Sequence, residues 1–203
     1  YTLVYTLSLH DALPIYELKK KWFLISSIDE LENRTIFTKE EKKWLRENSI
    51  VVGIDSDYKP MNFINKKGQL TGLTIDFLKE LEKITSKNFI IKSQPWSKVL
   101  EDAQNNGVDI VANINKTSNR TQYLDFTQSY LTVPMGLITK DEVKKYDSLE
   151  HLEDKIVIVK RDSAEAEFIS RNYPNIKLMI VNNYDDALTI LNDNKADAIF
   201  AHL

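Results

Sequence analysis

From Ile50 onward the chain alternates short β-branched apolar runs with amphipathic segments of about ten residues. The run IVVGI is followed by a segment with helical spacing that begins near Thr74, and then by the run FIIKS. The alternation returns from Lys155 with KIVIV, AEAEFISR, KLMIV, YDDALTIL and ADAIF. Strands that alternate with helices of this length indicate βαβ units, so we predict an α/β protein whose parallel sheets carry helices on both faces.

The chain divides into four expected parts, residues 1–15, 16–48, 49–136 and 137–203. The first resembles translated sequencing-adapter sequence and is set aside. The second is expected to hold linker helices, one of which begins at a capping box formed by Thr38 and Glu41. The last two are expected to be a first lobe and an incomplete second lobe, joined by a strand that crosses between them at residues 132–140.

Composition excludes several classes of function. Of the 203 residues, 42% are hydrophobic and 28% are charged, which is typical of a globular protein with a real core. A net charge of −3 gives no reason to expect nucleic acid or an anionic membrane surface as a partner. Cysteine is absent and no glycine-rich phosphate loop occurs, so no cofactor and no metal are expected. No apolar run approaches the roughly 18 residues that span a bilayer, so a membrane anchor is expected only outside this sequence.

The polar turn NINKTSNR, residues 113–120, follows directly on the predicted strand VDIVA. In open parallel α/β sheets, ligands bind beyond the carboxyl ends of the strands. That rule nominates four loops for the site, which are DSDY, NINKTSNR, KRDS and AHL.

These loops, in this order, resemble those of the family 3 extracytoplasmic solute-binding proteins. The resemblance covers Ile50 to Leu203 and is carried by GIDSDYKPMNF, GQLTGLTIDFL, GVDIVANINKTSNRTQYLDFTQSY and YDDALTILNDNKADAIFAH. It implies the type II periplasmic-binding fold, a Venus flytrap of two α/β lobes that closes on a small amino-acid-like or organic-acid ligand. On this resemblance the second lobe is expected to be incomplete, without the last piece of the fold, which returns to the first lobe.

The segment FTKEEKKWLRENSIVVGID resembles the start of tandem sensor modules in membrane-bound histidine kinases, and YELKKKWF resembles the end of a preceding module. This implies a periplasmic sensor module in a membrane-anchored receptor, with an adjacent binding module and a downstream kinase or cyclase. A free substrate-binding protein of an ABC-type amino-acid transporter is the alternative. A dehydratase-type enzyme on the same fold is a third and less favoured class, because only Asp55 and His202 are plausible acids or bases.

Arg120 is the main candidate for ligand binding. An arginine in a polar turn is usually a solvated surface charge. Its place at the end of NINKTSNR matches the arginine that holds the ligand's α-carboxylate in the family, and a planar guanidinium can donate two parallel hydrogen bonds to a carboxylate. The resemblance therefore favours a carboxylate-binding role, with Thr117 keeping the turn rigid.

Five more candidates lie in the first lobe, and each has an ordinary structural alternative. Asn113 and Asn115 match positions near the ligand's ammonium and carboxylate groups, although asparagine is also a common turn residue. Tyr58 and Trp96 match aromatic walls of the ligand pocket, although core packing is the commoner fate of such residues. Asp55 matches a contact to the distal amine of basic ligands and could equally cap the turn.

In the second lobe the sequence departs from the family pattern. Asp162 and Glu165 are expected to form a D-x-x-E capping box, Ser163 to keep small polar character, and Arg161 stands where a glycine is usual. His202 stands where the family carries an aspartate that pairs with the ligand's ammonium group, unless the match slips at the chain end. Neutral imidazole cannot neutralise a full positive charge, so we predict weak binding of ordinary α-amino acids and favour a carboxylate ligand without an ammonium group.

Overall fold

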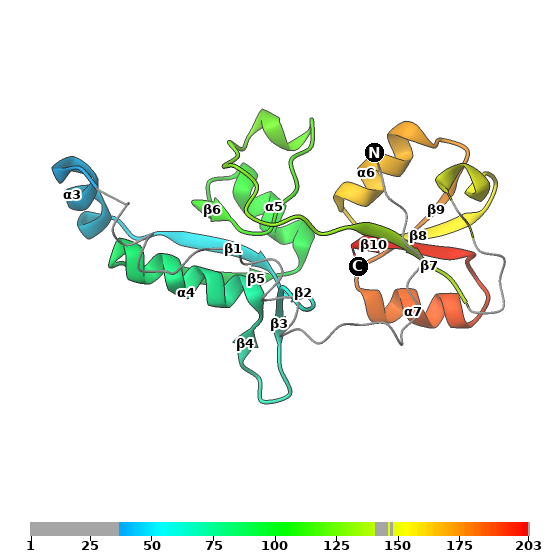
Figure 1. Cartoon of the computed structure of the whole chain (residues 1–203), viewed down its shortest axis with the longest axis horizontal. Coiled ribbons are helices and arrows are strands. Elements are labelled where there is room, and N and C mark those ends of the chain that lie inside the picture. The colour runs from blue at the N-terminus through cyan, green and yellow to red at the C-terminus, as the bar shows by residue number, and fades with distance from the viewer. Residues whose placement is uncertain (1–36, 141–145, 147, 203) are drawn as a thin grey trace. The chain divides into compact units, whose positions relative to one another are not determined.

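The structure is a computed structural model that describes residues 37–140, 146 and 148–202 (Figure 1). The segments expected at residues 1–15 and 16–23 lie outside the described residues. The described chain forms two compact units, residues 37–126 (the first unit) and residues 127–202 (the second unit). Among the described helices, none is long and apolar enough to cross a membrane.

The first unit is built on a parallel sheet with β1 at its centre. In chain order its elements are α3 (Lys39–Glu47), β1 (Val51–Asp55), β2 (Asp57–Tyr58), β3 (Asn62–Ile64), β4 (Leu70–Thr71), α4 (Leu73–Thr85), β5 (Ile90–Gln94), α5 (Trp96–Gln104), β6 (Ile110–Val111) and the 3₁₀ helix η1 (Arg120–Gln122). The strand order is β5-β1-β6, with both pairs parallel. The prediction of a parallel sheet is confirmed for this unit.

Helices cover both faces of this sheet, as predicted. Val52 and Ile54 of β1 are fully buried in a cluster that includes Ile75 of α4. On the other face, a Cβ added to Gly53 would lie 3.0 Å from Val99 Cγ1, so α5 packs directly against the bare backbone of β1. Figure 1 shows α4 and α5 on opposite sides of β1. The side-chain period of two in β1 thus assigns alternate residues to the two helices.

Two local predictions for this unit hold, and one small sheet was not predicted. The capping box ahead of α3 is present, because Glu41 N–H donates to Thr38 Oγ1 at 3.2 Å and Thr38 N–H donates to Glu41 Oε2 at 2.7 Å. The predicted turn at residues 65–69 joins β3 to β4. These strands and β2 form an antiparallel sheet, β2-β3-β4, whose two- and three-residue strands are too short for a sequence pattern to reveal.

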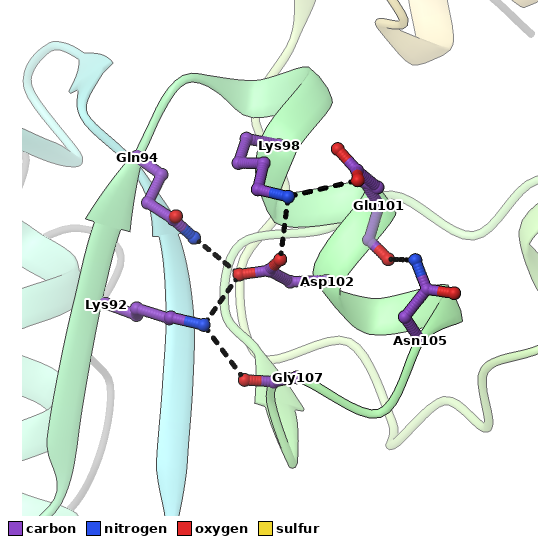
Figure 2. Close-up of polar contacts among 7 residues, drawn as sticks. All are labelled: Lys92, Gln94, Lys98, Glu101, Asp102, Asn105 and Gly107. Carbon is purple, nitrogen blue, oxygen red and sulfur yellow. Dashed lines mark hydrogen bonds and ion pairs between the residues drawn. The ribbon is translucent and has the colours of Figure 1, made fainter.

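The carboxylate of Asp102 fastens α5 to β5 (Figure 2). Asp102 Oδ2 accepts hydrogen bonds from Lys92 Nζ at 2.8 Å and from Gln94 Nε2 at 2.9 Å, both on β5. Asp102 Oδ1 lies 3.3 Å from Lys98 Nζ, one turn earlier on α5. The hydrogen bond from Lys92, followed by those from Gln94 and Lys98, holds the pKa of Asp102 well below its usual range. Because Trp96 begins α5, this cluster also helps to fix where Trp96 lies.

The second unit has a four-stranded sheet with helices on both faces. Its elements are β7 (Met135–Ile138), the 3₁₀ helix η2 (Leu149–Leu152), β8 (Ile156–Lys160), α6 (Ala164–Asn172), β9 (Lys177–Val181), α7 (Tyr184–Asn192) and β10 (Ala198–His202). Val157 and Val159 share a buried cluster with Ile169 of α6, whereas Ile158 shares one with Leu191 of α7. The strand order is β7-β10-β8-β9.

The first strand of this sheet corrects the prediction of an all-parallel arrangement. β7 pairs with β10 in antiparallel orientation, because it enters the unit as an added edge strand and not through a helical crossover. Met135 and Gly136 pair with residues of β10 and so lie in the second unit. The two compact units divide between Phe126 and Thr127, and the expected division of the lobes after residue 136 stays a prediction.

Replacing Asp102 by Asn should destabilise the first unit at neutral pH, because the carboxylate that binds three donors loses its charge. A carboxyl group whose pKa is depressed by folding stabilises the fold above its unfolded pKa of about 3.9, and that stabilisation is lost as the pH falls through the folded pKa. The difference between wild type and Asp102→Asn in urea unfolding, followed by circular dichroism, should therefore be full at pH 7 and shrink below about pH 4.

Glu101→Gln is the matched control, because Glu101 lies on the same helix and contacts Lys98 from a more exposed position. It should leave the unfolding midpoint nearly unchanged at both pH values. A difference between wild type and Asp102→Asn that stays constant with pH would contradict the assignment.

Candidate functional site

The sequence-predicted residues of the first unit gather where three neighbouring strands end. Asp55 is the last residue of β1, Trp96 follows β5 after Pro95, and Asn113 follows β6 after Ala112. Because β5, β1 and β6 are parallel neighbours, these positions share one edge of the sheet. Two of the loops nominated from the sequence, DSDY and NINKTSNR, thus begin at this edge, and their role as a binding site stays a prediction.

Arg120 is buried and stacked on an aromatic ring. Arg120 is only 5% exposed, and its Cζ atom lies 5.3 Å from the centroid of the Trp96 ring. Arg120 Nη1 donates to the Asn115 carbonyl oxygen at 2.8 Å, and Arg120 N–H donates to Thr117 Oγ1 at 3.3 Å. The burial excludes the interpretation of Arg120 as a solvated surface charge. The role expected for Thr117, support of the turn, agrees with its hydrogen bond.

The guanidinium group of Arg120 lies within cation–π distance of the Trp96 ring. The N–H donors of arginine point outward in the plane of the guanidinium group. Donation to the Asn115 carbonyl anchors the group to the turn that carries it. This arrangement can present a fixed donor edge to a carboxylate.

The side chain of Asn113 is held in a buried polar network. Its Nδ2 donates to Thr74 Oγ1 and, at 3.5 Å, to Asn62 Oδ1. Thr74 Oγ1 in turn donates to Asn62 Oδ1 at 3.0 Å. Asn113 has a backbone φ of +57°, a conformation that asparagine tolerates better than most residues, so its turn chemistry is present.

Sequence reasoning missed Asn62 and Thr74. Asn62 is 1% exposed, and its Nδ2 donates to the carbonyl oxygen of Asp55. The sequence held one signal for Asn62, which is a polar residue between the apolar Met61 and Phe63. If such a residue is buried, its amide needs hydrogen-bond partners. Its partners could not be inferred, since Asn113 lies 51 positions away in the sequence.

Asp55 ends β1, and Tyr58 lies in the short strand β2 that follows. Asp55 is buried, and its Oδ1 accepts from the N–H of Asp57 at 3.1 Å, which is the turn-capping role given as the alternative to a ligand contact. Tyr58 lies in β2, is half-buried and pairs with Asn62 across the small sheet. Ligand contacts by Asp55, Tyr58, Asn115 and Trp96 remain predictions.

In the second unit, the helix cap differs from the prediction. The N-cap of α6 is Ser163, whose Oγ accepts from Ala166 N–H at 3.1 Å. Asp162 precedes the cap in a left-handed conformation with a φ of +55° and is exposed. The predicted capping box of Asp162 and Glu165 is therefore wrong, because Asp162 takes the turn and leaves the capping position to Ser163.

Glu165 instead forms a buried pair with His202. His202 Nδ1 lies 2.6 Å from Glu165 Oε1, and Glu165 is 3% exposed. Burial by itself would raise the pKa of Glu165, but the hydrogen bond and charge of His202, with bonds from its own backbone and from Ser163, outweigh burial and lower the pKa. His202 thus ends β10 beside an acidic partner that the sequence pattern assigned to a helix cap.

Two basic residues, Lys160 and Arg161, follow one another at the carboxyl end of β8. Lys160, the last residue of β8, is buried with its Nζ 5.6 Å from the centroid of the Tyr184 ring. Arg161 Nε donates to Asn182 Oδ1 at 2.9 Å. Across the described ranges, no three His, Asp or Glu side chains gather closely enough to hold a metal ion.

The chain belongs to the bacterial extracellular solute-binding proteins, family 3, which residues 50–201 match. The virulence sensor protein BvgS of Bordetella pertussis is 23% identical over 194 residues, which cover 93% of this chain and 16% of that protein. The L-cystine-binding protein TcyJ of Bacillus subtilis is 30% identical over 126 residues, which cover 61% of this chain and 47% of that protein. The chain therefore spans less than half of either relative.

The fold has a counterpart among solved structures. The ancestral amino acid-binding protein AncCDT-1, a precursor of cyclohexadienyl dehydratase, superposes with a TM-score of 0.70 and 27% identity, over 81% of this chain and 74% of that one. The predicted α/β type II periplasmic-binding fold and the resemblance to the solute-binding family are confirmed.

Replacing Ser163 by Ala should lower the free energy of unfolding of the second unit by about 1 kcal/mol, because Ala166 N–H loses its side-chain acceptor. Asp162→Gly is the matched control, since glycine suits the positive φ at that position. Urea unfolding should separate the two variants. Equal losses in both would restore the capping role to Asp162.

Replacing His202 by Ala should destabilise the second unit by about 3 kcal/mol at pH 7, because a buried carboxylate loses its partner. With His202 removed, burial is the largest remaining influence on the pKa of Glu165 and raises it, so the variant should recover stability relative to wild type as the pH falls toward about 4. The exposed His151→Ala provides the control, with no change expected at either pH. A small loss at pH 7 for His202→Ala would argue against the buried pair.

Proposed function

We propose that this chain is an extracytoplasmic binding domain for a small ligand with a carboxylate group, and that Arg120 is the residue that holds this group. The observation that carries the proposal is the burial of Arg120 against Trp96 at the carboxyl edge of the first unit's sheet. Burying a guanidinium group is costly, and a family whose members bind solutes supplies a reason to retain one.

The chemistry of the guanidinium group favours a carboxylate over other ligand groups. Arginine recognises planar carboxylates with two parallel charge-assisted bonds, and the stacking on Trp96 reduces the number of orientations that must be ordered on binding. Asp55 at the end of β1, Tyr58 in β2 and Asn115 in the turn before Arg120 are proposed as further contacts. Asp162, Ser163 and His202 are proposed contacts from the second unit.

His202 is the basis for a narrower proposal about the ligand. It stands where members of the family carry an aspartate, and its imidazole is already paired with Glu165. An imidazole in this setting is a poor substitute for a free carboxylate that neutralises an ammonium group. We therefore propose a carboxylate ligand without an α-ammonium group over an ordinary amino acid.

A sensor role is proposed ahead of a carrier role. The virulence sensor of Bordetella pertussis matches nearly the whole chain, 93% of it, and this supports a periplasmic sensor module anchored to a membrane through other parts of the protein. An adjacent binding module and a downstream kinase or cyclase are proposed partners. Ligand binding would then bias a signalling equilibrium by its differential affinity for two states.

The carrier alternative has its own support in the 30% identity to an L-cystine-binding protein. The gene sequence downstream of residue 203 distinguishes the two. A transmembrane helix followed by a kinase or cyclase domain favours the receptor, whereas a stop codon soon after the binding domain favours the carrier.

We propose a non-catalytic role, although one structural neighbour is a precursor of a dehydratase. The two candidate acids or bases are both engaged, Asp55 Oδ1 with the N–H of Asp57 and His202 with Glu165. Elimination assayed on prephenate-like substrates tests the enzymatic alternative, and turnover that is lost in His202→Ala would establish it.

Calorimetry on the whole chain with matched ligand pairs tests the binding proposal. The pairs are L-glutamate with glutarate, L-aspartate with succinate and L-phenylalanine with 3-phenylpropionate, which differ in the ammonium group. Each acid without an ammonium group should bind more tightly than its amino-acid partner. Submicromolar binding of several amino acids would overturn this preference.

Arg120→Lys should weaken binding of the acids at least about 10-fold, because lysine keeps the charge and loses the planar fork. Arg46→Lys, on the exposed surface of α3, is the control and should bind as wild type does. If Arg120→Lys binds every probe as tightly as wild type does, Arg120 is not the carboxylate anchor.

A further inference from the structure

The turn that carries Arg120 is fastened at both of its ends. At its end, Arg120 donates to the carbonyl of Asn115 and to the hydroxyl of Thr117, so the last part of the turn closes on itself. At its start, the amide of Asn113 enters the buried network with Thr74 and Asn62. The first fastening is local, whereas the second ties the turn to distant parts of the unit.

Asn62 is the hub of that second fastening. Its Oδ1 accepts from Thr74 and Asn113, and its Nδ2 donates to the backbone carbonyl of Asp55. Asn62 lies on β3, Thr74 in the first turn of α4, and Asp55 at the end of β1. One buried amide therefore joins four segments, and the turn begins at a point that β1, β3 and α4 define together.

We infer that Asn113 is a positioning residue, which sets the place of Arg120 through Asn62 and Thr74 and does not itself touch the ligand. Asn113 Nδ2 is directed to a buried hydroxyl and a buried carbonyl oxygen, both in residues at most 2% exposed. Asn113 has a positive φ at the start of the turn, and Arg120 at the end of the turn lies 5.3 Å from the centroid of the Trp96 ring. The part of this inference that concerns ligand affinity rests on the proposed function of Arg120.

The chain offers a matched pair of variants. Asn113→Gly removes the amide and keeps the backbone conformation, because glycine accepts a positive φ without strain. Asn106→Gly is the control, since Asn106 has a φ of +56°, nearly the same as the +57° of Asn113, and is exposed. Thr74→Val breaks the same network from α4 without touching the turn.

A first measurement needs no ligand. The Nε–Hε resonance of Arg120, assigned by its absence in Arg120→Lys, reports the stacking on Trp96 through the ring current. Asn113→Gly and Thr74→Val should both shift this resonance, while Asn106→Gly leaves it unchanged. If the resonance stays in place in Thr74→Val and in a folded Asn113→Gly, the network does not position Arg120 and the inference fails.

A second measurement separates positioning from direct contact. In a double-mutant cycle with glutarate as probe, Asn113→Gly should weaken binding about 10-fold alone and less than about 2-fold in the Arg120→Lys background, within the range in which neighbouring residues couple. An effect that stays full in both backgrounds would make Asn113 a direct contact and overturn the inference. If Arg120→Lys itself has no effect on glutarate or L-glutamate, the proposed function fails, and the resonance test still decides whether Asn113 positions Arg120.

Discussion

The parallel pairing of β1 with a strand on each side is the constraint on which the first unit depends. β1 lies between β5 and β6, so the loops that follow all three strands open at one edge of the sheet. This pairing brings Trp96, which follows β5, near Arg120, which follows β6 by a polar turn. The buried guanidinium group is therefore a product of sheet order, and its stacking partner comes from a helix that the sheet positions.

Two polar clusters on either side of β1 make this burial possible. Asp102 draws donors from β5 to α5 and so holds the helix that begins with Trp96. Asn62 joins β1, β3, α4 and the turn that ends at Arg120. In the network around Asn62 and Thr74, which are buried, a shift of the turn would leave a donor or acceptor unpaired at a cost of roughly 1–3 kcal/mol. The ring and the guanidinium group are thus held by separate supports.

In the second unit the main buried electrostatic interaction is the pair of Glu165 and His202. A carboxylate that is 3% exposed needs a partner, and His202 at the end of β10 provides one within 2.6 Å. A buried pair of this kind is weak evidence for net stability, but removal of one member leaves the other without compensation. His202 is therefore bound into the structure through Glu165, and any ligand chemistry it takes part in is shared with that residue.

The sequence by itself determined the order and type of the main helices and strands, because apolar periodicity and capping residues act within a few positions of one another. It also determined the family, through motifs in order, and nominated the loop that carries Arg120. Only the tertiary structure decided the antiparallel entry of β7, the pairing of Glu165 with His202, and the network that links Asn62 to Asn113. Each of these depends on residues that are far apart in the chain and meet only when the sheets have formed, and a local pattern holds no information about such meetings.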